Sequence, residues 1–158
     1  MDRTEFERLT TKYLDRVYRF CLSCVNQRED AEDLTQNTFL KLWKSDQVFA
    51  DDESVKRWLI RVAVNESSDL FRSPWKKRRV SLEDLDAEPA VQTKEHEEII
   101  EAVWNLPVKY RQVIYLYYFE GYKAGEIAQI LGRSETAVQT QLQRGRHKLR
   151  EQLEKEHE

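Results

Sequence analysis

Residues 122–149 read YKAGEIAQILGRSETAVQTQLQRGRHKL, and this stretch decides the expected fold. Apolar Ile127, Ala128 and Leu131 predict a short helix from about 124 to 131. Gly132 permits the positive φ of a tight turn, and Ser134 is placed to cap the helix that follows. A short helix, a glycine turn and a polar helix start together predict a helix-turn-helix, whose second helix can enter a major groove of DNA.

The second helix, expected over about 134–153, has an apolar side and a polar side. Its apolar stripe is formed by Val138, Leu142, Leu149 and Leu153. Side chains that can hydrogen-bond to base edges are Glu135, Thr136, Gln139, Thr140, Gln141 and Gln143. Cations suited to phosphate contact are Arg133, Arg144, Arg146, Lys148 and Arg150. The alternative interpretation is a plain helical hairpin with a solvated basic face.

The net charge of −3 combines blocks of opposite sign. Residues 55–80 carry 8 basic and 2 acidic side chains, and residues 133–150 carry 5 basic and 1 acidic. Residues 81–101 carry 8 acidic side chains and 1 basic. Charges interact over about 8–10 Å at physiological salt, so the local blocks matter more than the total. The two basic blocks are therefore candidate nucleic-acid surfaces, although the total alone argues weakly against such a binder.

The rest of the chain also has helical periodicity. Apolar residues spaced by three and four predict helices at about 6–24, 30–43, 55–73, 95–105 and 113–120. Residues 81–94 are acidic, contain a proline and lack periodicity, which predicts a linker. Only 4 glycines and 3 prolines are present, too few for the turns of a β-sandwich or barrel. The predicted fold is all-α, with helical domains at 1–76 and 95–158 and a flexible acidic linker at 77–94.

A second set of polar residues lies near the start of the helix at 30–43. Asp30, Asp33 and Gln36 are three residues apart and share one expected exposed face, with Leu34 and Phe39 beside them. A polar stripe with apolar neighbours can dock another helix. The equally weighted alternative is a solvated helix start, because acidic side chains are favoured near the positive end of the helix dipole.

The end of the basic block, FRSPWKKRRV at 71–80, mixes aromatic and cationic side chains. Phe71 and Trp75 stand among arginines and lysines, a composition that suits single-stranded or opened nucleic acid because bases stack and phosphates pair. Trp58 lies on the apolar stripe of the same predicted helix and is expected in the core.

Several other classes of protein are disfavoured. No apolar run approaches the roughly 18 residues of a membrane span. The N-terminus lacks the apolar segment of a signal peptide, and we expect no further C-terminal domain. A Gly-rich phosphate loop, an HExxH motif and a nucleophile elbow are all missing, which argues against an enzyme. His96, His147 and His157 are scattered among charged residues and are expected to be solvated.

The two cysteines, Cys21 and Cys24, form a CxxC on one face of the first predicted helix. A zinc site needs about four ligands, and no second Cys or His pair accompanies them. We therefore predict buried core cysteines, no metal and no cofactor. Two cysteines cannot build a disulfide framework, which favours a cytosolic protein.

Two rival binding classes explain less of the sequence. A helix-turn-helix repressor or a response-regulator output domain would account for 122–149 but not for the face at 30–36 or the basic aromatic block. A structural helical adaptor would have no need of polar side chains after a glycine turn.

Three segments in order resemble the extracytoplasmic-function (ECF) sigma factors, which are small two-domain bacterial initiation factors. EDAEDLTQNTFLKLWKS at 29–45 resembles their region 2.2, and RWLIRVAVNESSDLFRSPWKKRR at 57–79 resembles regions 2.3 and 2.4. The stretch from Leu106 to Leu149 resembles region 4. The resemblance implies a cytoplasmic protein that binds core RNA polymerase and directs it to promoters without itself entering a membrane. It also implies a controlling anti-sigma factor, free or membrane-bound.

The resemblance assigns roles to three sets of residues. Docking on the β′ coiled coil of the polymerase, whose β subunit is a further expected contact, falls on Asp30, Asp33, Leu34, Gln36 and Phe39. Capture of a flipped base in the promoter −10 element falls on Asn65, Ser68, Asp69, Arg72 and Lys76. Recognition of the −35 element falls on Ser134, Thr136, Gln139, Thr140, Gln141 and Arg144.

The chain departs from the usual family pattern at a few positions. Gln139 and Gln141 replace common basic residues, and Tyr117 stands where Arg is frequent. Gln favours adenine and Arg favours guanine, so the preferred −35 sequence is expected to differ from the usual one. Asn37 replaces a common acid, which is expected to weaken one polymerase contact. Gly145 replaces a common Ala, at a cost of about 1 kcal/mol in helix propensity.

Overall fold

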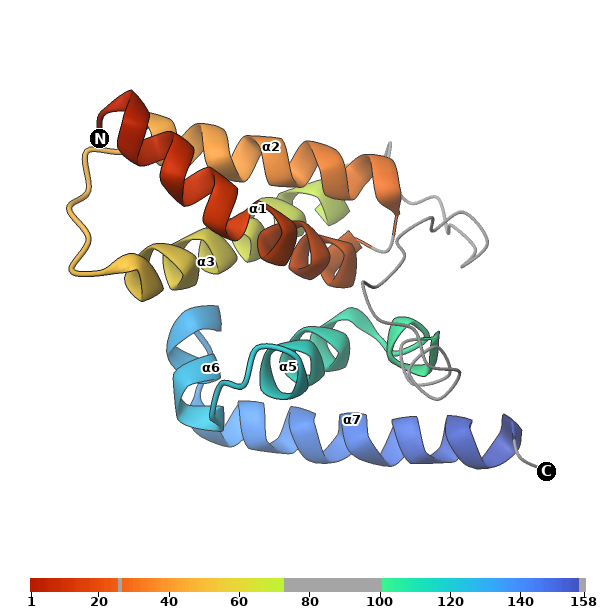
Figure 1. Cartoon of the computed structure of the whole chain (residues 1–158). Helices are drawn as coiled ribbons and strands as arrows, with labels where there is room; N and C mark the ends of the chain where they lie inside the picture. The colour runs from red at the N-terminus through yellow and green to blue at the C-terminus, as the bar shows by residue number, and fades with distance from the viewer. Residues whose placement is uncertain (26, 73–100, 157–158) are drawn as a thin grey trace. The chain divides into compact units, whose positions relative to one another are not determined.

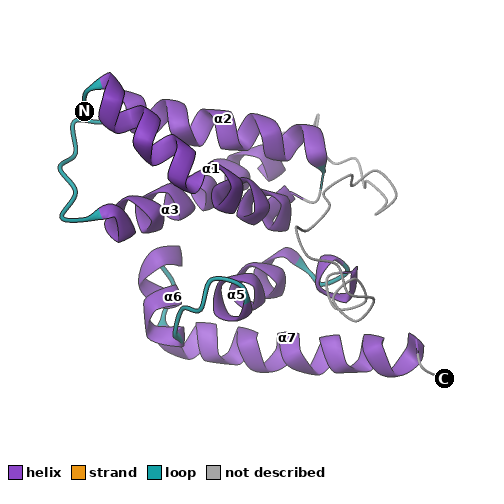
Figure 2. Cartoon of the chain, in the orientation of Figure 1, coloured by secondary structure: helices purple, strands orange, loops and turns teal. Residues whose placement is uncertain are grey.

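The computed structural model describes residues 1–25, 27–72 and 101–156. The chain divides into two compact units, Met1–Asp84 and Leu85–Glu158. Every regular element within the described residues is a helix, so the predicted all-α fold is confirmed (Figure 2). The predicted linker and Lys76 lie outside the described residues, and the exact domain boundaries stay a prediction.

The N-terminal unit is built from α1 (Arg3–Val25), α2 (Arg28–Lys44) and α3 (Asp52–Arg72). Each helix packs against the other two (Figure 1). Their apolar stripes meet in a core whose fully buried members include Leu9, Val17, Phe20, Leu34, Leu42 and Leu59. Trp58, predicted in this core, is instead half-buried, and its ring meets that of Phe49 edge to face at 5.7 Å.

The third helix starts earlier than its apolar pattern predicts. Asp51 accepts hydrogen bonds from the Ser54 backbone N–H at 2.8 Å and from the Ser54 hydroxyl at 2.7 Å. Such a side-chain cap satisfies a backbone donor that the first helical turn leaves open. The helix therefore begins at Asp52, three residues before the first apolar residue of the stripe.

A charged cluster joins α1 to the first turn of α3. Arg8 donates to both carboxylate oxygens of Asp52 at 2.8 and 2.9 Å, and Lys12 donates to the same carboxylate at 2.7 Å. These hydrogen bonds hold the pKa of Asp52 well below its usual range. Because the cluster is exposed, its contribution to the stability of the fold is small.

Both cysteines lie in the core of the N-terminal unit. Cys21 and Cys24 are each 0% exposed, and burial raises the pKa of the Cys21 thiol. The thiolate is the form that binds metals, so this environment disfavours metal binding. Within the described ranges, no three His, Cys, Asp or Glu side chains are grouped as a metal site would require.

We expect a chelator such as EDTA to leave the melting temperature of the protein unchanged, because the buried thiols act as packing groups. Differential scanning calorimetry with and without EDTA measures this directly. A lower melting temperature in EDTA would contradict the assignment of the cysteines to the core.

The C-terminal unit contains α5 (Val108–Tyr118), α6 (Ala124–Leu131) and α7 (Glu135–Glu156), and residues 101–104 are also helical. Both α5 and α6 pack on α7. Gly132 ends α6 with φ 68°, and the Ser134 hydroxyl accepts the Ala137 backbone N–H at 3.1 Å. The helix α5 ends at Tyr118, and Gly121, with φ 74°, lies in the connection between α5 and α6. The predicted helix-turn-helix is therefore confirmed down to its turn and its cap.

Gly145 lies where α7 packs against Tyr110 and Ile114 of α5. A Cβ at this position would lie 3.0 Å from Cγ1 and 3.3 Å from Cδ1 of Ile114, and 3.4 Å from Cβ of Tyr110. Ile114 is only 1% exposed and has little room to move. The glycine, which costs helix propensity, thus allows the two helices to pack closely.

Gly145→Ala is expected to give no gain in the free energy of unfolding. The helix-propensity gain of about 1 kcal/mol is offset by overpacking, which costs about 1–3 kcal/mol. Gly125→Ala in α6 is the matched control, because its Cβ would meet only the Glu135 side chain at 3.6–3.7 Å. That control is expected to stabilise by about 0.5 kcal/mol. Urea denaturation compares the two, and an equal gain in both variants would contradict the packing argument.

Candidate functional site

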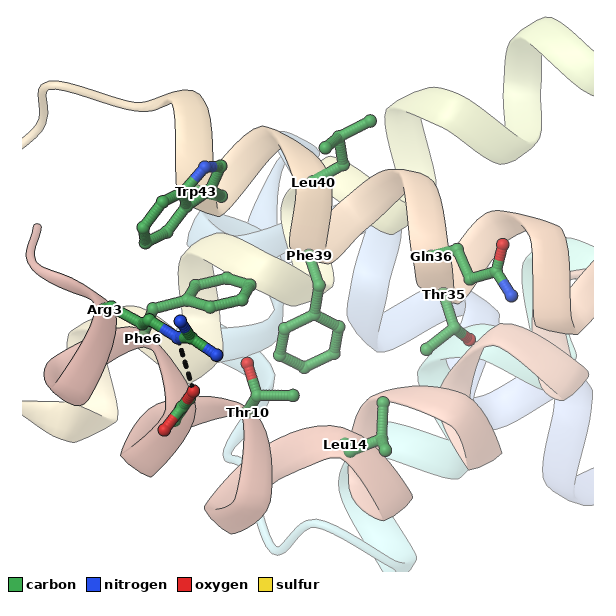
Figure 3. A pocket seen from close by; sticks show the side chains of 10 residues that line it. Arg3, Phe6, Thr10, Leu14, Thr35, Gln36, Phe39, Leu40 and Trp43 are labelled. Atoms are coloured by element: carbon green, nitrogen blue, oxygen red, sulfur yellow. Dashed lines mark hydrogen bonds and ion pairs between the residues drawn. The ribbon is translucent and has the colours of Figure 1, made fainter.

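An apolar groove of about 660 Å³ runs between α1 and α2 (Figure 3). The residues that line it are Arg3, Phe6, Glu7, Thr10, Leu14, Thr35, Gln36, Phe39, Leu40 and Trp43. The rings of Phe6 and Trp43 meet edge to face with centroids 5.0 Å apart. Arg3 and Glu7 form an ion pair of 2.9 Å along the same groove.

One polar atom in this groove has no partner. The hydroxyl oxygen of Thr10 is buried and makes no hydrogen bond to any described residue. Leaving a buried hydroxyl unpaired costs about 1–3 kcal/mol. The Thr10 hydroxyl is therefore a buried polar atom of the groove wall, and the apolar side chains are what the groove offers to a partner.

The residues predicted on the exposed face of the second helix lie at different depths. Asp33 and Gln36 are exposed, and Asp30 is half-buried. Gln36 and Phe39 line the groove. Leu34 does not belong to this face: it is 1% exposed, because its side chain turns into the three-helix core. Leu34 therefore supports the surface from inside and cannot meet a partner directly.

Of the ten groove residues, only Gln36 and Phe39 were predicted from the sequence, and the exposed apolar residues of α2, Leu40 and Trp43, were not. They are 48% and 43% exposed, although both are large and apolar. The signal was present in the sequence, since Gln36, Leu40 and Trp43 follow one another by four and three residues and share a helix face. Apolar residues on a face that is not covered mark an interaction site.

Four of the five predicted −10 positions lie in the second half of α3. Asn65 is exposed, and Ser68 is exposed with its hydroxyl donating to the Val64 carbonyl at 3.1 Å. Asp69 and Arg72 belong to α3 by their backbone, and Lys76 lies outside the described residues. Glu66, next to Asn65, forms an ion pair with Lys41 of α2. This ion pair links the end of α3 to the helix that forms one wall of the groove.

The polar residues of α7 divide between an outer and an inner side. Thr136, Gln139, Gln143 and Arg144 are exposed, Thr140 is half-buried, and Ser134 is an exposed cap. Thr136, Gln139, Thr140 and Gln143 are spaced to share one face, and their hydroxyl and amide groups can hydrogen-bond to base edges. This face is therefore a candidate nucleic-acid interface.

Gln141 of α7 and Arg133 of the turn before α7 lie on the inner side, toward α5. Arg133 donates to Oε1 of Gln141 at 3.0 Å and to Oε1 of buried Gln112 at 2.5 Å. The arginine thus joins α5, the turn and α7, and it is not the free phosphate contact predicted from sequence. Gln141 follows buried Val138 by three residues and precedes Gly145 by four, so helical spacing turns it toward α5. Its amide is engaged in this contact and does not lie on the outer face.

No helix in the described part of the chain combines the length and the apolar character needed to cross a bilayer.

Comparison with known proteins gives matches along most of the chain. Residues 9–77 match the family Sigma-70 region 2, and residues 96–149 match Sigma-70, region 4. The chain is 33% identical over 150 residues to RNA polymerase sigma factor SigV of Bacillus subtilis, covering 92% of this chain and 89% of that protein. It is 32% identical over 145 residues to ECF RNA polymerase sigma factor SigM of Bacillus subtilis, covering 87% and 88%.

A solved structure has a similar fold. The sigma factor RpoE in complex with the anti-sigma factor NepR, from Bartonella quintana, matches with a TM-score of 0.76 and 23% identity. The match covers 95% of this chain and 97% of that chain. At this identity the likeness supports the arrangement of helices and not the function of single residues.

Proposed function

This chain belongs to the ECF sigma factors, and from that premise we propose which of its surfaces contact the polymerase and the promoter. A sigma factor is an initiation factor and not an enzyme: it binds core RNA polymerase, recognises promoter DNA and supports strand opening. The observation that carries the assignment is the match to sigma regions 2 and 4, in that order, together with a helix-turn-helix built within region 4.

The groove between α1 and α2 is the proposed docking surface for the β′ coiled coil of core polymerase. Asp30, Asp33, Gln36 and Phe39 retain the roles given by the family resemblance, with Leu34 as a supporting core residue. Leu40 and Trp43 join them because they are exposed, apolar and line the same groove as Gln36. The outer face of a coiled coil presents charged side chains with long aliphatic stems, because its apolar seam is buried between its own helices. Such side chains can pair with exposed Asp33 and pack their stems on the apolar walls of the groove.

The end of the third helix is the proposed site of −10 base capture, through Asn65, Ser68, Asp69, Arg72 and Lys76. The proposed −35 reader is the outer face of α7, formed by Thr136, Gln139, Thr140 and Arg144, with Ser134 at its start. Gln141 acts in this proposal by holding α7 in place, because its amide oxygen accepts from Arg133.

Control by an anti-sigma factor is part of the same proposal. The similar RpoE structure contains the anti-sigma factor NepR, and the exposed apolar groove of this chain offers a surface that an inhibitor could cover. Because RNA polymerase works in the bacterial cytoplasm, the chain is placed there as well.

Run-off transcription with core RNA polymerase on a library of promoter sequences tests the proposed function. Core enzyme with the protein is expected to initiate from a subset of the library that shares a −35 and a −10 element. Core enzyme alone is expected to leave that subset silent. A complex that forms but initiates no promoter-dependent transcript would contradict the proposal.

A further inference from the structure

Three side chains meet where the end of α5 lies beside α7. The Nε of Arg146 donates to the hydroxyl oxygen of Tyr118 at 2.7 Å. The guanidinium also lies over the rings of Tyr117 and Tyr118, 5.0 and 5.7 Å from their centroids. The two rings meet edge to face at 5.0 Å. Tyr117 is 36% and Tyr118 is 54% exposed, and Arg146 is exposed too. We call these three residues the tyrosine–arginine cluster.

The cluster holds its arginine in place and leaves most of its donors available. An arginine has five N–H donors, and the contact with Tyr118 uses only the one on Nε. Among the described residues, Arg146 has no carboxylate partner. The Tyr118 hydroxyl acts as acceptor toward Arg146, so its own hydrogen can be donated elsewhere. A planar fork whose orientation is already fixed loses less entropy when it binds a tetrahedral anion.

The position of the tyrosine–arginine cluster on α7 indicates that the anion is a phosphate of the DNA backbone. Arg146 follows Gln139 by seven residues and Gln143 by three, so it lies along the same edge of α7 as these exposed amides. Residues 133–150 carry 5 basic side chains and 1 acidic, which attracts a polyanion to this edge. In DNA complexes the residues beside the base-reading positions contact the sugar-phosphate backbone.

We propose that the tyrosine–arginine cluster binds one backbone phosphate of promoter DNA, next to the base pairs that α7 reads. The inference rests on the proposed function of α7 as the −35 reader. The Nη1 and Nη2 groups of Arg146 donate to the phosphate oxygens, and the Tyr118 hydroxyl donates one more hydrogen bond. Tyr117 acts as a positioning residue, because its ring lies against the guanidinium.

A scan with methylphosphonate linkages tests the assignment. Each linkage removes the charge of a single phosphate in a promoter fragment chosen from the run-off library. Binding is measured for the full chain in complex with core polymerase. At one position, the wild-type complex is expected to lose about tenfold in affinity, as for loss of a charged hydrogen-bond pair. The Arg146→Gln complex is expected to bind unmodified DNA more weakly than the wild type by a similar factor. The methylphosphonate at that one position is expected to weaken the binding of this variant no further.

Three further variants sharpen the test. Tyr118→Phe keeps the ring and removes the hydroxyl, so about half of the effect on a logarithmic scale is expected. Arg146→Lys keeps the charge without the fork and is expected to restore only part of the affinity. Lys155→Gln removes the same charge from an exposed position nine residues further along α7 and is expected to bind like the wild type.

The outcomes separate this inference from the proposed function. The complex could still bind its promoter specifically while the affinity losses caused by Arg146→Gln and by each methylphosphonate were additive. That result would overturn the phosphate assignment alone. That assignment would also fail if Arg146→Gln lowered the melting temperature without any coupling to a single phosphate, since the cluster would then only tie α5 to α7. Equal binding of the wild-type complex to promoter and scrambled fragments would overturn both the inference and the proposed function.

Discussion

Trp43→Ala is expected to weaken binding to core RNA polymerase by about 30- to 1,000-fold, or about 2–4 kcal/mol, as for a central interface hot spot. The indole is 43% exposed, lies against the Phe6 ring and forms part of the groove between α1 and α2. A half-exposed aromatic ring gains the remainder of its burial energy when a partner covers it. The expected cost to folding is smaller, about 1–2 kcal/mol, because the indole is only partly buried in the free protein.

Competition against labelled wild-type protein for core polymerase measures this effect. Val48→Ala is the matched control, because Val48 is 92% exposed and is not among the residues that line the groove. The control is expected to compete like the wild type. If Trp43→Ala also competed at wild-type strength while remaining folded by circular dichroism, the groove would not be the polymerase-docking surface.

Gln139→Ala is expected to reduce base discrimination at one −35 position by about 1–3 kcal/mol, or about 5- to 150-fold. A glutamine reads adenine through a pair of hydrogen bonds in the major groove. Gln139 is exposed, and its contact with Glu135 is long, at 3.5 Å, so its amide is available to DNA. Run-off transcription from promoters with each base pair at each −35 position measures the change.

Gln141→Ala is the comparison that makes this prediction specific. Its amide oxygen accepts from Arg133, so the substitution is expected to leave base discrimination unchanged and to lower stability by about 1 kcal/mol. A loss that was equal on all promoter variants for Gln139→Ala would remove that residue from the base-reading set. A change in base preference for Gln141→Ala would contradict the division of α7 into an outer and an inner side.

The parts of the structure that could be predicted from the sequence are those that depend on residues close together in the chain. The turn at Gly132 and the cap at Ser134 depend on neighbouring residues alone, so the helix-turn-helix was predictable at the level of its backbone. The start of α3 was misplaced, because apolar spacing does not register the cap provided by Asp51. The turn was predictable because Gly132 and Ser134 are themselves turn and cap signals, whereas the cap at Asp51 lies outside the apolar spacing from which the start of α3 was predicted.

The sites were harder to predict, because they depend on which helix faces remain uncovered. Leu34 and Leu40 are both apolar residues of α2, and only the packing of α1 and α3 buries the first and exposes the second. Arg133 and Gln141 were predicted as DNA contacts because of their chemistry. Gln112, which accepts a hydrogen bond from Arg133, lies on α5, distant in the sequence, and no local pattern identifies it.

The separation between the residues that hold α7 in place and the residues on its outer face affects how promoter preference can diversify. The residues that fix the helix, Arg133 with Gln112 and Gln141, are distinct from the exposed amides on its outer face. Mutations at Gln139 or Gln143 can therefore accumulate without refolding the domain. With the proposed role of this face as the −35 reader, such a scaffold allows a bacterium, or a designer of orthogonal gene circuits, to retarget a regulon by exchanging a few side chains.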